Sequence, residues 1–191
     1  MRTFIAIDFP KEILEKISRI ITFLQSQTTE KALKWVETDI MHLTLKFIGE
    51  ISEDAARDVQ TIMRHTLQGQ NAFEVSIEGL GMYPNPKNPR VVWLGISAEK
   101  ALFDIQKNLD LALQKINIPS EKRGFSPHLT IARLRKSTDV KTIRLIGETL
   151  SQFKVDSLGT VLIKEIRLYQ SQLTPTGPIY TPLLKIPLNQ V

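Results

Sequence analysis

His42-Leu43-Thr44-Leu45 and His128-Leu129-Thr130-Ile131 are two copies of one short phrase, and they hold two of the three histidines in the 191-residue chain. Successive side chains of an extended strand point to opposite faces. Each phrase therefore places an imidazole and a hydroxyl on one face and two aliphatic side chains on the other. We predict that the aliphatic face packs in the core and that the polar face carries chemistry.

The sequence around the two phrases repeats as well. Each phrase follows an apolar strand and an amphipathic helix, and each precedes a second helix. Ile7 lies 35 residues before His42, and the corresponding apolar residue of the second copy, Leu94, lies 34 residues before His128. Near-equal spacing indicates an internal duplication. We predict a pseudo-two-fold fold whose axis brings both imidazoles to one cleft, with lobes that need not be contiguous in the chain.

Hydrophobic periodicity and turn residues predict the other elements. Helices are expected at 11–27, 52–67, 102–116 and about 138–150. Strands are expected at 2–9, 41–48, 73–80, 90–96, 153–156 and 160–169, and the short segment 34–36 leads into the first phrase. Three prolines within 83–89 predict a loop because they remove backbone donors and fix the backbone, and 174–178 predicts a turn before a final extended segment.

Composition excludes several classes of protein. The chain has no cysteine, which removes disulfides, thiolate catalysis and cysteine-based zinc sites. Three scattered histidines argue against a protein-built metal centre, so we expect no metal and no cofactor. No apolar run approaches the roughly 18 to 20 residues of a membrane helix, and Met1–Asp8 is too short and too soon acidic for a signal peptide. We therefore expect a cytoplasmic protein without a membrane partner.

The net charge of +5 favours an anionic partner. Basic residues gather around both phrases, which is typical of an electrostatic funnel for nucleic acid, although a solubilising surface would also explain them. They are Lys122, Arg123, Arg133, Arg135 and Lys136 near the second phrase, and Lys34 and Lys46 near the first.

Two imidazoles and two hydroxyls suit the opening or closing of a phosphodiester without a metal. A neutral imidazole takes a proton from the attacking oxygen, and an imidazolium gives one to the departing oxygen. Thr44 and Thr130 would donate hydrogen bonds to the non-bridging phosphate oxygens. A single His-x-Thr in a strand is ordinary surface polarity, but two equivalent copies favour a catalytic pair. His65 lies off the apolar stripe of its helix, and we interpret it as solvated.

Several longer segments carry a family resemblance. They are Arg2-Thr3-Phe4-Ile5-Ala6-Ile7, Lys34-Trp35-Val36, residues 42–49 (HLTLKFIG), residues 126–133 (SPHLTIAR) and Leu168-Tyr169-Gln170-Ser171. Over nearly the full length, the chain resembles the two-histidine (2H) phosphoesterase superfamily, and within it the RNA 2′,3′-cyclic phosphodiesterases, historically called 2′-5′ RNA ligases. The resemblance implies an α+β, bilobal fold over residues 1–191, a single domain with two antiparallel sheets flanked by helices and a central active-site cleft.

The resemblance also implies an activity: hydrolysis of 2′,3′-cyclic phosphate ends of RNA to 2′-phosphomonoesters, with reversible 2′-5′ ligation as a further reaction of the same site. His42 and His128 match the catalytic pair, and Thr44 and Thr130 match the phosphate-binding hydroxyls. Arg133 matches an arginine that could hold phosphate or lie over a base, unless it is a plain surface residue. Phe47 could stack on a nucleobase, although its strand parity with Leu43 and Leu45 favours the core.

Other functions stay open at this point. A binding module could hold RNA ends or a cyclic nucleotide without turnover, and a phosphodiesterase could act on small cyclic nucleotides or 2′-5′ oligonucleotides. The expected partners are RNA 2′,3′-cyclic phosphate ends or cyclic nucleotides, and the protein is expected to be a monomer. A symmetric pair does not reveal which histidine is the base.

Overall fold

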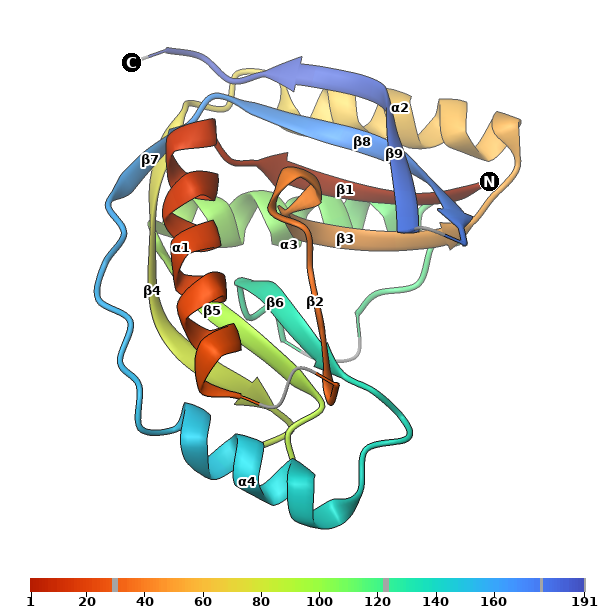
Figure 1. Cartoon of the computed structure of the whole chain (residues 1–191). Coiled ribbons are helices and arrows are strands. Elements are labelled where there is room, and N and C mark those ends of the chain that lie inside the picture. Colours follow the sequence, from red (N-terminus) through yellow and green to blue (C-terminus); the bar gives the residue numbers. More distant parts are fainter. Residues whose placement is uncertain (29–30, 122–123, 176, 191) are drawn as a thin grey trace.

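Two antiparallel β-sheets form the framework of the computed structural model, which describes residues 1–28, 31–121, 124–175 and 177–190 (Figure 1). Sheet 1 contains, in spatial order, β3 (His42–Glu50), β1 (Arg2–Asp8), β8 (Glu165–Thr174) and β9 (Gly177–Pro187). Sheet 2 contains β2 (Leu33–Trp35), β6 (His128–Leu134), β5 (Val91–Ala98), β4 (Phe73–Tyr83) and β7 (Thr160–Ile163). The α+β class predicted from the sequence is confirmed.

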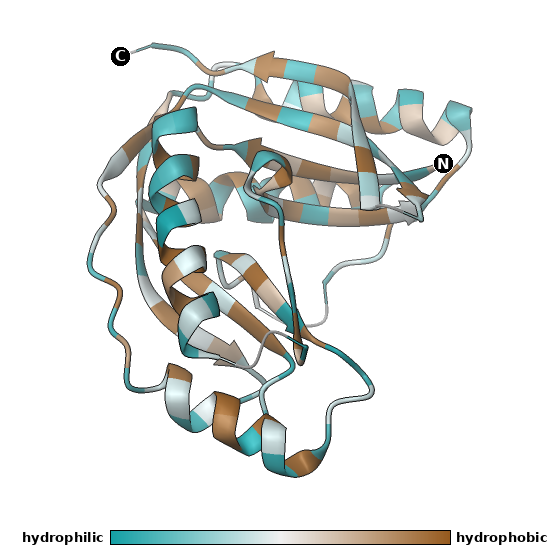
Figure 2. Cartoon of the chain, viewed as in Figure 1, coloured by the Kyte–Doolittle hydropathy of each residue, from teal (hydrophilic) through white to brown (hydrophobic). Residues whose placement is uncertain are grey.

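Each sheet is covered by two helices. α2 (Glu53–Leu67) and α3 (Lys100–Gln114) pack on each other beside sheet 1, whereas α1 (Lys11–Gln27) and α4 (Val140–Leu150) lie beside sheet 2 (Figure 1). A short 3₁₀ turn, η1 (Thr38–Ile40), precedes β3. Hydrophobic residues recur along each helix at the spacing that buries one face (Figure 2). Ser52 caps α2 and Asp139 caps α4, each accepting from a backbone N–H.

The duplication is interlocked rather than side by side. The order β3-β1-β8 in sheet 1 repeats as β6-β5-β4 in sheet 2. β4 belongs to the first half of the chain but pairs with β5 of the second half, and β8 of the second half pairs with β1 of the first. Each sheet therefore contains strands from both halves. The lobes are thus not contiguous in sequence, a possibility that the sequence analysis left open.

The predicted strand at 153–156 is wrong. This segment runs beside β4 and α1 through isolated hydrogen bonds, from the Gly79 amide to the Val155 carbonyl (2.8 Å) and from the Leu158 amide to the Ile77 carbonyl (2.9 Å). β4 has a register irregularity at this point, with a positive φ at Gly79, so a regular ladder starts only at β7. Phe153 packs edge-on against Phe23.

The predicted strand at 160–169 is two strands in different sheets. β7 pairs with β4 in sheet 2, and β8 begins after Lys164 and pairs with β1 in sheet 1. A run of alternating apolar residues has the same appearance on either side of such a crossing, because side-chain periodicity does not depend on the partner strand. β4 also continues to Tyr83, so the proline-rich loop begins one residue later than predicted.

α4 approaches this proline-rich loop very closely at one glycine. A Cβ added at Gly147 would lie 1.8 Å from the Pro86 carbonyl oxygen, which belongs to the backbone. The two segments meet at this distance only because residue 147 has no side chain. The contact fixes α4 against the end of β4.

We expect G147A to lower the free energy of unfolding by about 1 to 3 kcal/mol, the usual cost of overpacking. Alanine favours a helix by about 1 kcal/mol over glycine, which offsets only part of the clash. Denaturant unfolding would measure the change. G124A is the matched control, because a Cβ there meets nothing within 4 Å. Equal stability of G147A and the native protein would contradict this packing.

Candidate active site

Both histidines stand at the first position of a strand, and both are fixed in the same way. His42 Nδ1 lies 2.9 Å from the Ile40 carbonyl oxygen, and His128 Nδ1 lies 2.7 Å from the Ser126 carbonyl oxygen. A carbonyl only accepts, so Nδ1 of each ring carries the proton and donates it. Nε2 is then the nitrogen left for proton transfer in both copies.

The two threonines follow on the same face. Thr44 and Thr130 are half-buried, whereas the aliphatic residues that alternate with them are almost fully buried. Their exposures are 1% for Leu43, 2% for Leu45, 1% for Leu129 and 0% for Ile131. The predicted split into a polar face and a core face is therefore confirmed. We call the side of each sheet that carries these residues its histidine face.

A β-bulge interrupts the alternation just after each phrase. In sheet 1, Ala6 pairs with Thr44 but Ile5 pairs with Lys46, so Leu45 and Lys46 both lie on the buried side. Phe47 then returns to the histidine face with 55% of its surface exposed. The expectation of a core Phe47 from strand parity is wrong for this reason.

The second copy has the same bulge. Trp93 pairs with Thr130 and Val92 pairs with Ala132, so Ile131 and Ala132 are both buried. Arg133 therefore reaches the histidine face of sheet 2 and is exposed. Phe47 and Arg133 occupy equivalent positions of the duplication. The bulges place an aromatic ring on one sheet and a guanidinium on the other, each three residues beyond a threonine.

His42 has an apolar environment. Its ring stacks on Phe4 with centroids 4.6 Å apart, and the ring of Tyr180 meets it edge-on at 5.1 Å. Burial lowers the pKa of His42, while the hydrogen bond to Ile40 and the charge of Asp8 act in the opposite direction. The neutral imidazole is the favoured form near neutral pH.

Asp8 pairs with His42 in the β1–β3 ladder and belongs to a polar network on the same face. The Tyr169 hydroxyl donates to Asp8 Oδ2 at 2.6 Å, and Arg167 donates to the same oxygen and to Glu165. Burial, followed by the hydrogen bond to Asp8, raises the pKa of Tyr169 to about 12. The phenol therefore stays protonated, and the network holds a carboxylate beside His42.

His128 has different neighbours. Tyr83 meets its ring edge-on at 5.2 Å, and the Tyr83 hydroxyl lies 3.0 Å from Ser126 Oγ. Trp93 lies 6.1 Å from His128 by centroids and covers Gly81, where an added Cβ would come within 2.1 Å of the indole. Gly95 pairs with His128 where Asp8 pairs with His42. The two imidazoles thus share one geometry but differ in their electrostatic surroundings.

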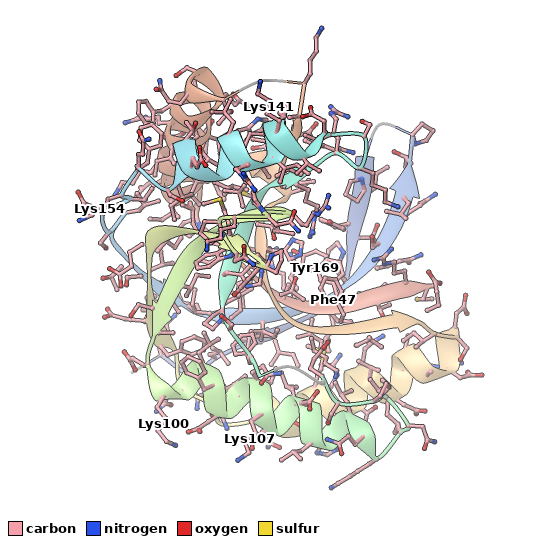
Figure 3. The ribbon with its side chains drawn as sticks, turned by 90° about the horizontal axis from the view of Figure 1, so that it is seen from below. Phe47, Lys100, Lys107, Lys141, Lys154 and Tyr169 are labelled. Carbon is pink, nitrogen blue, oxygen red and sulfur yellow. The ribbon has the colours of Figure 1, made fainter. Side chains whose placement is uncertain are left out.

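The two histidine faces approach each other. β3 and β6 contact one another, and both begin at a histidine. Burial raises the pKa of Tyr180 on sheet 1, and the charges of Arg2 and of Arg133 on sheet 2 act in the opposite direction. Arg133 is therefore within electrostatic reach of a phenol that touches His42. Figure 3 shows Phe47 and Tyr169 near the middle of the molecule, while Lys100, Lys107, Lys141 and Lys154 lie toward its outside.

The basic residues predicted to form a funnel separate into different groups. Lys46 is 2% exposed and pairs with Asp110 on α3 at 2.6 Å, so it is an internal ion pair and the funnel prediction is wrong for it. Lys34 is exposed and pairs with Arg133 in the β2–β6 ladder. The remaining described cations, Arg135 and Lys136, are exposed beyond β6, whereas Lys122 and Arg123 lie outside the described residues.

Three further observations concern the described residues. His65 is exposed in the last turn of α2, as predicted for a solvated residue. No group of three or more His, Asp or Glu side chains within 1–28, 31–121, 124–175 and 177–190 is arranged to hold a metal ion. No helix in these ranges has both the length and the hydrophobicity needed to cross a bilayer.

Some residues of the histidine faces were missed by the sequence analysis. They are Phe4, Asp8, Tyr83, Trp93 and Tyr180. The sequence held a signal for Phe4 and Asp8, because they lie four residues apart in the predicted strand 2–9 and therefore point to the same side of it. For Tyr180 no local signal existed, since its position depends on which strand β9 pairs with.

The chain is similar to known proteins over nearly its full length. The model of the LigT like Phosphoesterase family matches the chain twice, over residues 7–93 and 94–180, so each match contains one His-x-Thr phrase. The RNA 2′,3′-cyclic phosphodiesterase of Methanothermobacter thermautotrophicus is 38% identical over 185 residues, covering 96% of each chain. The Archaeoglobus fulgidus protein of the same name is 36% identical over 184 residues, covering 96% of this chain and 98% of that one.

Solved structures show the same fold. The crystal structure of E. coli LigT complexed with 3′-AMP superposes with a TM-score of 0.78 and 26% identity, covering 99% of this chain and 98% of that chain. A crystal structure of E. coli LigT complexed with phosphate gives a TM-score of 0.72 at 25% identity, with the same coverage.

The environment of His42 predicts a pH dependence of stability. Its folded-state pKa lies below the usual 6.5, so the unfolded chain binds more protons between these two values. The contribution of His42 to the free energy of unfolding is fully present above pH 6.5, and it is lost as the pH falls through the folded-state pKa. We expect the unfolding free energy, measured by denaturant titration between pH 5 and 7, to depend less on pH in H42N. The control is H65N, which removes an exposed imidazole; an equal pH dependence in both variants would contradict the assignment.

Proposed function

Because the chain belongs to the LigT like Phosphoesterase family, we propose that it hydrolyses 2′,3′-cyclic phosphate ends of RNA to 2′-phosphomonoesters. The observation that carries this proposal is the duplicated His-x-Thr site. Each imidazole donates Nδ1–H to a carbonyl two residues earlier and keeps Nε2 for proton transfer. The activity named for the relatives with 38% and 36% identity supports the choice of substrate.

The proposed reaction needs one acid and one base. Nε2 of one histidine accepts a proton from water as the water oxygen attacks phosphorus. The P–O3′ bond breaks, and Nε2–H of the other histidine gives a proton to O3′, leaving the phosphate on O2′. Thr44 and Thr130 donate hydrogen bonds to the non-bridging oxygens, where negative charge accumulates. The two histidines thus account for both proton transfers, and the two threonines account for the contacts to the non-bridging oxygens.

Phe47 and Arg133 are proposed to hold the rest of the terminal nucleotide. The exposed ring of Phe47 offers a surface on which a base can stack. Arg133, at the equivalent position of the other sheet, can donate two parallel hydrogen bonds to phosphate or lie over the base. Their placement by matching bulges supports a shared role on opposite sides of one ligand.

The same site can also join RNA ends. A 5′-hydroxyl in place of water would attack the cyclic phosphate and form a 2′-5′ linkage, with one histidine taking the proton of the hydroxyl and the other giving a proton to O3′. The two histidines exchange these roles only when the 2′-5′ linkage is cleaved back to the cyclic phosphate. A small cyclic nucleotide is a second candidate substrate, because the similar E. coli protein has been crystallised with the mononucleotide 3′-AMP. Turnover of an RNA end compared with a mononucleotide separates these substrates.

We also propose that residues 1–191 act as one domain and that the protein is a monomer. The interlocked strands support the first point, because neither half has a complete sheet of its own. A cytoplasmic location is proposed from the RNA substrate. Light scattering and cell fractionation test the last two proposals.

We expect H42A and H128A each to lower kcat for a 2′,3′-cyclic-phosphate RNA end by roughly 10² to 10⁴, the usual worth of a positioned acid or base. Release of the 2′-phosphomonoester, measured by chromatography, gives the rate. H65A is the control. Near-native turnover by both single variants would refute the mechanism, and tight binding of unchanged RNA by the native protein would indicate a binding module.

We propose that catalysis needs no metal, because two imidazoles supply both proton transfers. The native enzyme should keep its full rate after dialysis against EDTA, and its rate should show a bell-shaped pH profile. A rate that falls with EDTA and returns with an added divalent cation would contradict metal independence.

A further inference from the structure

A row of polar side chains crosses three strands of sheet 1 beyond Phe4. Arg2 on β1 pairs with Ser171 on β8, and Ser171 pairs with Tyr180 on β9. Directly opposed residues of antiparallel strands share a face, with Cβ atoms about 4.5 to 5.5 Å apart. Arg2 and Ser171 have the strand parity of Phe4 and Tyr169, so the row lies on the histidine face. It presents a guanidinium and two hydroxyls side by side.

A second row lies on the histidine face of sheet 2. Lys34 on β2 pairs with Arg133 on β6, which places an ammonium beside the guanidinium already assigned to the terminal nucleotide. The charges of Arg2 on sheet 1 and of Arg133 on sheet 2 both act to lower the pKa of the Tyr180 phenol, which agrees with the contact between β3 and β6 that brings the two sheets together. Within the described part of the chain, Arg2, Lys34 and Arg133 have no ion-pair partner.

One acidic residue, Glu50, lies beside the first row. It pairs with Arg2 in the β1–β3 ladder, but its carboxylate lies 3.6 Å from the N-terminal ammonium. Arg2, Lys34 and Arg133 therefore outnumber the one carboxylate that is paired with any of them in the strand ladders. The local charge favours an anion.

The position of Arg2 along β1 indicates which anion would bind there. Ala6 pairs with Thr44, Phe4 pairs with Phe47, and Arg2 follows two residues beyond Phe4. The order along β1 is thus the reacting phosphate, a stacking ring and then a cation, over roughly 13 Å of extended strand. The β8–β9 hairpin ends beside the start of β1 and the end of β3 (Figure 1). Leu173, near its tip, is 67% exposed and shares the parity of Ser171.

We propose that Arg2, Ser171 and Tyr180, with Lys34 and Arg133 opposite, form a second anion subsite for the phosphodiester on the 5′ side of the terminal nucleotide. The proposal rests on the proposed function and extends it: the substrate is an oligonucleotide end, and a free cyclic mononucleotide leaves this subsite empty. The exposed Leu173 lies where the preceding nucleoside would leave the site.

Three substrates test the subsite: adenosine 2′,3′-cyclic phosphate, its 5′-phosphorylated derivative, and the dinucleotide ApA ending in a 2′,3′-cyclic phosphate. We expect kcat/KM to be roughly three- to tenfold higher for the last two, as expected for a partly exposed charge-assisted contact, mainly through KM. In R2Q the ratio of kcat/KM for the dinucleotide to kcat/KM for adenosine 2′,3′-cyclic phosphate should fall toward one, and R2K should retain most of the native ratio. The KM of the dinucleotide should depend less steeply on salt in R2Q than in the native enzyme.

The matched control is K141Q, which removes an exposed cation on α4 that belongs to neither row. Equal kcat/KM values for all three substrates in the native enzyme would overturn the subsite and leave the proposed function intact. So would a preference for the dinucleotide alone, because a 5′-phosphate should suffice. An equal loss in R2Q and K141Q, or a loss in R2Q that is the same for every substrate, would also overturn it. Failure to hydrolyse any of the three would refute the proposed function itself.

Discussion

The exchange of one strand between the two halves is the constraint on which the structure depends. β8 completes the sheet that begins with β1 and β3, and β4 completes the sheet that begins with β5 and β6. The side chains that alternate with the histidine faces join one continuous core, which includes Ile5, Leu43, Leu94 and Leu129. Neither sheet can form from one half alone. The relative position of the two histidine strands is therefore fixed by backbone pairing and core packing, and it does not rely on a flexible link between lobes.

The duplication is symmetric in backbone and asymmetric in electrostatics. Both histidines use the same Nδ1 contact, and both strands carry the same bulge, so the two Nε2 atoms are placed alike and Phe47 and Arg133 occupy equivalent positions. The residue paired with each histidine differs, with Asp8 on one side and Gly95 on the other. Acid–base chemistry needs one neutral and one charged imidazole, and the burial that lowers the pKa of His42 favours its neutral form. The repeated strands give both imidazoles the same geometry, and the different residues around each ring give them different electrostatic surroundings.

Lys46 and Ala132 occupy the same bulge position in the two copies, but their side chains interact differently with the core. The bulge turns both residues toward the buried side. At 132 a methyl group fills the space, whereas at 46 an ammonium is held by Asp110 and the Pro119 carbonyl, each at 2.6 Å. Burial acts to raise the pKa of Asp110, but hydrogen bonds from Lys46 and Ser120 and the charge of Lys46 lower it overall. A buried lysine without these partners would be costly. Its charge stabilises the packing of α3 on β3 and is not available to a ligand.

The sequence by itself determined the duplicated phrase, the polar and aliphatic faces of its strands, the helices and the α+β class, because these follow from local periodicity and spacing. Only the tertiary structure decided that Phe47 and Arg133 share a position, since a bulge depends on the register of the partner strand. Strand pairing likewise decided that 160–169 divides between two sheets and that Tyr180 reaches His42. Pairing between distant strands is a property of the whole packed chain, whereas side-chain alternation is a property of each strand alone.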